Sequence, residues 1–180
     1  LKQAFLKAKE GDFVAIASHN TLSVLWITSI SKEELVIEEL GIPESFMKEQ
    51  DITTWLQTGA LHHTLWNRYV LRKKEWVITE STSLLKTTAM NHEYGKTLET
   101  LLSLPLLPIK EEERTKIGPV PIEGEDFRKT WLPPLKMNGK PLLKHQIMVK
   151  KVVWPKDHSP MAGQSLTLYL SPLSPFPLWV

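Results

Sequence analysis

Residues 13–37 read FVAIASHNTLSVLWITSISKEELVI, and this stretch decides the fold class. It contains three runs rich in apolar and β-branched residues, at 13–17, 22–30 and 35–37. Short polar segments separate the runs, and such segments predict turns. Two parallel strands need a crossover of a dozen or more residues, which these links cannot supply. The stretch therefore predicts an antiparallel meander of three strands, with a turn at His19-Asn20.

Three helices are predicted around this meander. Residues 1–10 and 91–103 repeat apolar residues every three or four positions, and residues 44–58 form a third candidate. Asp51 offers an alternative for the third helix, because its side chain can cap a shorter helix that begins at Ile52. The residues expected to be buried in this third helix are Phe46, Met47, Ile52, Trp55 and Leu56.

A second hairpin is predicted for residues 62–71 and 76–82, which are joined by a polar turn. Successive side chains of a strand point to opposite faces of the sheet. Leu65 and Tyr69 share the more apolar face, and we expect both to be buried. The opposite face is mixed in character, and its Trp66 and Arg68 are candidates for contact with other molecules.

The C-terminal third predicts one more strand pair. Residues 105–144 are rich in proline and predict loops with short strands. Residues 145–154 and 164–170 predict two antiparallel strands, because the link between them contains Pro and Gly residues that suit a loop. In the first strand the residues expected to point inward are Ile147, Val149 and Val153, with a bulge at Lys150-Lys151. In the second strand the face expected to meet the core carries Leu166, Leu168 and Leu170.

Together these patterns predict an α+β fold. We expect a curved, mostly antiparallel, half-barrel-like sheet of about eight to ten strands packed against two or three helices. A length of 180 residues suits a single domain over residues 1–180. The chain starts within a helical pattern and stops within a strand pattern. We interpret it as a fragment that lacks an N-terminal targeting sequence and a C-terminal strand.

Composition excludes several classes of site. The chain has no cysteine, which excludes a disulfide framework, thiol catalysis and Cys-ligated zinc. Its 22 basic and 20 acidic residues give a net charge of +2, whereas nucleic-acid binders usually have a larger basic excess. No apolar run approaches the roughly 20 residues that a transmembrane helix needs.

The histidines and serines give no specific catalytic or metal motif. His62 and His63 are adjacent, so on a strand they point to opposite faces and cannot easily chelate one ion. We expect no metal and no cofactor. Ser-x-x-Lys occurs three times, but the companion motifs S-D-N and K-T-G are missing. An alternative hypothesis is a small hydrolase whose Ser, His and Glu assemble in space, with His62, His92 or His145 as the base.

Exposed tryptophans and basic residues are the candidates for contact with a ligand or partner. This set consists of Trp66, Arg68, Trp76, Lys150, Lys151 and Trp154. The lysines of residues 140–156 are typical of a strand edge protected against aggregation. A second alternative is that residues 140–156 bind nucleic acid or another anionic surface.

Three stretches carry a resemblance to a known group of proteins. They are GDFVAIASHNTLSVLWI at 11–27, WNRYVLRKKEW at 66–76, and VVWPKDHSPMAGQSLTLYLSPLSPFPLWV at 152–180. In these stretches the chain resembles uncharacterised envelope-associated proteins of chlamydial-type obligate intracellular bacteria. The resemblance implies the periplasm or outer envelope, and a lipoprotein among the possible forms. It transfers no functional residues.

The expected function is therefore binding without catalysis. A curved sheet with helices on its concave side is also similar to the lipoprotein carriers of the periplasm, at the level of the fold alone. We expect a periplasmic or envelope protein that binds a hydrophobic ligand or a protein partner. The partners that fit this expectation are a lipid, a lipoprotein or another envelope protein.

Overall fold

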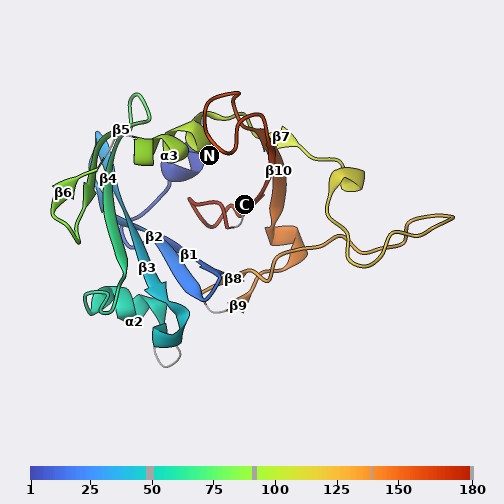
Figure 1. Ribbon diagram of the computed structural model, residues 1–180, viewed down its shortest axis with the longest axis horizontal. Helices are drawn as coiled ribbons and strands as arrows, with labels where there is room; N and C mark the ends of the chain where they lie inside the picture. The colour runs from blue at the N-terminus through green and yellow to red at the C-terminus, as the bar shows by residue number, and fades with distance from the viewer. Residues whose placement is uncertain (48–50, 91–92, 139, 179–180) are drawn as a thin grey trace.

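A six-stranded antiparallel sheet is the largest unit of the computed structural model, which describes residues 1–47, 51–90, 93–138 and 140–178 (Figure 1). Its strands lie side by side in chain order: β1 (Phe13–Ser18), β2 (Thr21–Ile30), β3 (Glu34–Pro43), β4 (Leu65–Arg72), β5 (Val77–Ser83) and β6 (Thr88–Ala89). The predicted meander is confirmed. The sheet is open, with β1 and β6 as its two edges.

The β1–β2 turn shows why this meander forms. His19 and Asn20 both have positive φ, at 50° and 63°. Two such residues in a two-residue hairpin turn match the right-handed twist of the flanking strands, and Asn tolerates this conformation better than most residues. The turn predicted at His19-Asn20 is therefore confirmed.

The β4–β5 hairpin is antiparallel, as predicted, and Tyr69 is buried with 7% of its surface exposed. Leu65 is half-buried, so it is less buried than Tyr69. It stands at the first position of β4, beside Gly41 at the end of the sheet. The strand also starts later than predicted, because His62 has a φ of 64° that a strand does not accommodate.

The helices are shorter than predicted. The third candidate divides into the 3₁₀ helix η1 (Glu44–Met47) and α2 (Ile52–Gln57), and residues 48–50 lie outside the described residues. Asp51 Oδ1 accepts a hydrogen bond of 3.0 Å from the Thr54 amide, so the capping alternative is confirmed. Phe46 is 55% exposed, and its predicted burial is wrong.

The other two helices lie on the opposite face of the sheet from α2. They are α1 (Lys2–Phe5) and α3 (Glu93–Ser103), and residues 91–92 at the predicted start of α3 lie outside the described residues. Leu102 of α3 and Phe5 of α1 pack on this face together with the C-terminal tail. Phe176 of the tail meets Phe5 edge to face, with ring centroids 5.2 Å apart. Trp55 and Leu56 of α2 cover part of the other face.

A second, three-stranded sheet has the order β11 (Ser165–Leu170), β10 (Met148–Val153) and β7 (Leu107–Pro108). The antiparallel pairing of β10 with β11 is confirmed, and Leu168 is fully buried. The inward face predicted for β10 is wrong. Val152 is buried and Val153 is 44% exposed, because Val152 lies opposite Leu166 on the face that packs against Leu101 and Leu104.

The bulge predicted at Lys150-Lys151 is also absent from the pairing of β10 with β11. The register runs without a shift from Met148 opposite Leu170 to Val153 opposite Ser165. A regular strand accommodates Lys150 and Lys151 because both side chains are only half-buried, so neither charge is enclosed in a core. A small two-stranded ladder, β8 (Lys136–Met137) with β9 (Lys140–Pro141), completes the strands of the described residues.

The α+β class with mostly antiparallel sheets and three α-helices is therefore confirmed. The strands differ from the expectation in that they are divided among three sheets. The cause is the proline-rich segment between α3 and β10, which contributes only short strands and two further 3₁₀ helices, η2 (Glu111–Glu113) and η3 (Lys144–Gln146). Proline has no amide hydrogen to donate to a ladder.

Candidate functional site

The six residues predicted to contact a ligand or partner lie in three separate places. Trp66 and Arg68 are on β4, in the middle of the six-stranded sheet. Trp76 lies in the turn between β4 and β5, while Lys150, Lys151 and Trp154 belong to β10 and the residue after it. The structure therefore does not bring these residues together in a single site.

Arg68 belongs to a row of side chains that crosses the sheet. The strand register places Phe13, Trp26, Glu38, Arg68 and Thr82 opposite one another on five successive strands. Arg68 is exposed and the other four are half-buried, so this face of the sheet is accessible to solvent. A row of aromatic and charged groups on an accessible sheet face is able to contact another molecule.

Trp66 holds the carboxylate of Glu38, a member of this row, in place. Its Nε1–H donates a hydrogen bond of 2.6 Å to Glu38 Oε2, and the Thr28 hydroxyl donates to Glu38 Oε1 at 3.4 Å. The indole of Trp66 also packs beside the cluster under α2. Trp66 therefore positions Glu38, and its polar atom already has a partner within the chain.

Three of the four remaining predicted contact residues have partners within the chain. Trp154 is 3% exposed and donates from Nε1 to Asp157 Oδ2 at 3.1 Å. Hydrogen bonds from Ser159, and then from Trp154, lower the pKa of Asp157. Lys151 forms an ion pair of 3.2 Å with Glu113. Trp76 is half-buried against the core, with a φ of 61°.

Two of the three histidines considered as a hydrolase base, His62 and His145, lie in the described part of the chain. His62 stacks on Phe46 with ring centroids 4.9 Å apart, and His145 is exposed in η3. His92 lies outside the described residues. Ser18 Oγ lies 2.8 Å from His19 Nδ1, but both residues are exposed in the β1–β2 hairpin. No group of three or more His, Asp or Glu side chains with metal-binding proximity occurs among the described residues.

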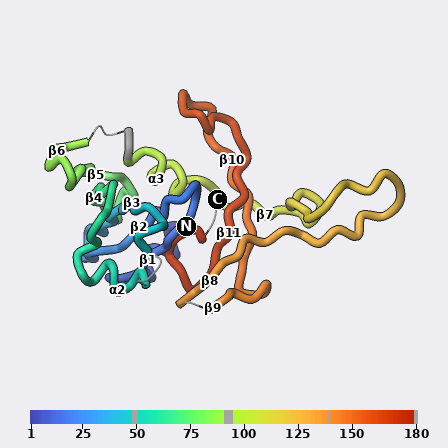
Figure 2. The backbone as a smooth tube through the Cα atoms, turned by 60° about the horizontal axis from the view of Figure 1, so that its bottom comes forward, coloured from blue at the N-terminus to red at the C-terminus, as the bar shows by residue number. Residues whose placement is uncertain are grey.

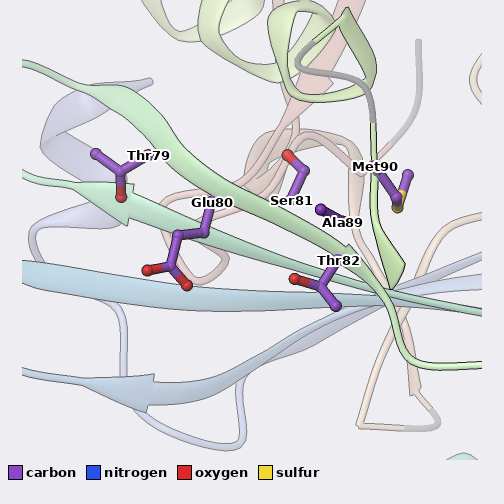
Figure 3. A pocket seen from close by; sticks show the side chains of 6 residues that line it. All are labelled: Thr79, Glu80, Ser81, Thr82, Ala89 and Met90. Atoms are coloured by element: carbon purple, nitrogen blue, oxygen red, sulfur yellow. The ribbon is translucent and has the colours of Figure 1, made fainter. Parts of the chain in front are cut away.

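A shallow pocket of about 350 Å³ lies along β5 and β6 of the six-stranded sheet (Figure 3). Four of its lining residues are polar, and only Ala89 and Met90 are apolar; the polar ones are Thr79, Glu80, Ser81 and Thr82. A second pocket of about 250 Å³ is lined mostly by polar residues of α1, α3 and the start of β5. Sites for hydrophobic ligands are lined mainly by apolar side chains. Neither pocket therefore has the lining that a lipid would need.

The most distinctive surface is a long arm, residues 109–134, which projects away from the rest of the chain (Figures 1 and 2). Its outer half is a narrow hairpin. The Ile117 amide donates to the Lys129 carbonyl at 2.8 Å, and the Trp131 amide donates to the Thr115 carbonyl at 2.7 Å. These two bonds flank the bridge between Lys116 and Thr130.

The side chain of Asp126 links the two sides of the hairpin near the far end of the arm. Its carboxylate lies 2.9 Å from Lys116 Nζ and 2.9 Å from Arg128 Nε, and Arg128 Nη1 donates to the Gly118 carbonyl at 3.1 Å. The hydrogen bonds from Arg128, and then from Lys116, hold the pKa of Asp126 far below its ordinary value. The arm therefore has a defined shape although it has no hydrophobic core of its own.

Large apolar side chains of the arm face solvent. Ile122 is 99% exposed, Phe127 85%, Val120 73% and Ile117 57%. Three of these lie in residues 118–127, here called the arm tip. Clusters of exposed apolar side chains mark interaction sites, because solvent exposure of such groups has a free-energy cost that only binding removes.

The sequence prediction missed the arm. Residues 105–144 were expected to form loops with short strands, which is correct locally but does not show where the segment lies. A usable signal was present in PVPIEGEDF at 119–127, where apolar residues occur without the period of a helix or a strand. Such residues have no regular partner face in the chain's own core.

Comparison with known proteins gives the family. The family described as CT021 protein matches residues 23–143, which is more than half of the chain. The chain belongs to the CT021 protein family. The matched region runs from β2 through the arm to the residues just before η3, so the whole arm lies within it.

A solved structure of the hypothetical protein CT021 from Chlamydia trachomatis resembles this CT021-family chain with a TM-score of 0.60. The identity is 16%, and the match covers 98% of this chain and 81% of that one. At this identity the likeness concerns the fold alone. No curated protein matches the sequence. The predicted resemblance to an uncharacterised chlamydial family is confirmed.

The described helices include none that is both long and apolar enough to cross a membrane.

Proposed function

We propose that this CT021-family chain is a non-catalytic envelope or periplasmic protein that binds a protein partner through the arm. The observation that carries this proposal is the exposure of Ile122 and Phe127 at the end of an ordered projection. Burial of large apolar side chains against a partner is the main favourable term in most protein–protein association.

The order of the arm supports binding over a merely flexible loop. The Asp126 cluster and the hairpin hydrogen bonds fix the backbone on both sides of the arm tip. A segment that is already ordered loses less conformational entropy when it binds, so more of its contact energy contributes to affinity. The arm thus presents its apolar groups in a prearranged geometry.

The charge of the arm tip favours a protein over a membrane or a nucleic acid. Residues 118–127 contain Glu123, Glu125 and Asp126 and no Lys or Arg. Anionic lipids and nucleic acids attract basic segments and repel acidic ones. The polar lining of both pockets weighs against a buried lipid ligand in the same way.

The proposed location rests on the resemblance to chlamydial envelope-associated proteins. We propose that the chain acts there by holding other envelope components in place. A lipoprotein form, attached to the membrane outside the described chain, is compatible with this role and forms part of the proposal.

Site-specific photo-cross-linking in the native host tests the proposed function. A photoreactive phenylalanine analogue is placed at Ile122, and at Leu61 as the matched control, since Leu61 is 63% exposed but lies away from the arm. We expect protein adducts from position 122 that are lost when Phe127→Asp is added, and none from position 61. Equal adducts from both positions, or adducts with lipid alone, would show that the arm does not bind a protein.

A further inference from the structure

Charge is divided unevenly between the arm tip and the chain that follows it. The arm tip is acidic, whereas residues 127–156 contain no Asp or Glu. The basic residues of that segment are Arg128, Lys129, Lys136, Lys140, Lys144, Lys150, Lys151 and Lys156. A difference of charge between two exposed surfaces favours contact between regions of opposite sign.

The basic region nearest the body is formed by β8, β9 and η3. It exposes Lys136, Lys140, Leu143 and Lys144, here called the arm base, and the exposed fraction of Leu143 is 59%. Lys144 is close enough to Glu111 of η2 to contribute to the lowered pKa of that carboxyl, after the hydrogen bonds from Thr130 and Arg114. This places the arm base where the arm joins the body.

The arm tip cannot reach the arm base of its own chain. Both views show the tip at the far end of the projection, with β8 and β9 at the other end of the segment that returns from it (Figures 1 and 2). The arm tip is apolar and acidic, and the arm base is apolar and basic, so the two surfaces are complementary. Within one molecule they are kept apart. The same surfaces can meet only between molecules.

From this arrangement we infer that the partner bound by the arm is a second copy of this chain. Two arms lie side by side in opposite directions, so that each arm tip contacts the partner's arm base. This two-fold arrangement is self-complementary and forms every contact twice. Glu123 and Glu125 face basic side chains, and Ile122 and Phe127 cover Leu143. The inference rests on the proposed function and specifies its partner.

Sedimentation velocity of the purified chain over a range of concentrations tests the inference. We expect a dimer whose dissociation constant rises at least about tenfold when salt is increased from low to high concentration, because exposed charge pairs are screened. Ile122→Asp combined with Phe127→Asp is expected to give a monomer. Leu61→Asp, an equivalent change away from the arm, is expected to leave the dimer intact.

Charge reversal tests the pairing itself. Glu123→Lys with Glu125→Lys, or Lys136→Glu with Lys140→Glu, is expected to weaken the dimer, and the combination of all four changes is expected to restore it. A wild-type monomer at the highest concentration, or a quadruple variant no tighter than either double variant, overturns the inference. If the wild-type chain is monomeric but position 122 still cross-links to another protein, the proposed function stands without the self-association.

Discussion

Gly95 on α3 lies so close to Ile78 on β5 that a Cβ atom built on the glycine would stand 2.9 Å from the isoleucine Cβ. The helix therefore rests directly on the sheet at this point, and Gly95 is buried. The Glu99 carboxylate, one turn further along α3, accepts a hydrogen bond from the Ile78 amide. Backbone contact and hydrogen bond together fix the position of α3 on the sheet.

Enlarging Gly95 should consequently destabilise the protein. Overpacking costs about 1–3 kcal/mol, and the better helix propensity of alanine returns only about 1 kcal/mol. Gly95→Ala is expected to lower the free energy of unfolding by about 1 kcal/mol, and Gly95→Val by more, as measured by denaturant titration. Lys96→Ala, on the exposed side of the same helix, serves as the control. An unchanged or higher stability in Gly95→Val would contradict the close packing.

A polar substitution at Leu168 should be strongly destabilising, because none of the surface of this side chain is in contact with water. It packs with Val152 and Leu170 in the core of the second sheet. Leu168→Asp is expected to remove at least about 3 kcal/mol of stability, since a buried carboxyl without a partner is costly. Thermal unfolding measures the effect, with Leu173→Asp as the exposed control. An unchanged midpoint would refute the core assignment of β11.

The Trp66–Glu38 hydrogen bond should contribute measurably to stability. It joins a half-buried indole to a carboxylate at 2.6 Å across two adjacent strands. Hydrogen bonds to charged groups are worth about 1.5–3 kcal/mol, and partial exposure reduces this to about 1 kcal/mol here. A double-mutant cycle of Trp66→Phe and Glu38→Ala measures the coupling by denaturant titration. A coupling energy near zero would mean that solvent replaces the bond without loss.

The shape of the arm should depend on the charge of Asp126. Because its pKa in the folded chain is lowered, the stabilisation is complete above the pKa of an unfolded aspartate. It is lost only when the pH falls through the lowered folded value. The arm hairpin is therefore expected to persist in mild acid, where ordinary carboxyls begin to protonate.

Hydrogen exchange at the Ile117 and Trp131 amides reports the state of the arm. Asp126→Asn is expected to accelerate exchange at both amides at neutral pH, while amides of β2 and β3 remain protected. Glu125→Gln is the matched control, because it removes a neighbouring charge outside the Lys116 and Arg128 contacts. Equal exchange in the wild type and in Asp126→Asn would show that other contacts hold the hairpin.

Features that depend on neighbouring residues were determined by the sequence itself. The turn at His19-Asn20, the Asp51 cap and the strand runs on either side of the turn are set by backbone preferences and contacts within a few residues. The pairing of β10 with β11 also followed from a link too rich in Pro and Gly for a helix. The chlamydial family was visible in the sequence for a similar reason, because motifs are local.

Only the tertiary structure decided which of these residues are available for contact. Val152 is buried and Val153 is exposed because of where distant leucines of α3 and β11 lie. Ile122 and Phe127 have ordinary apolar character in the sequence, but the arm carries them away from every core. Burial depends on contacts between segments far apart in the chain, and no local pattern encodes the absence of such contacts.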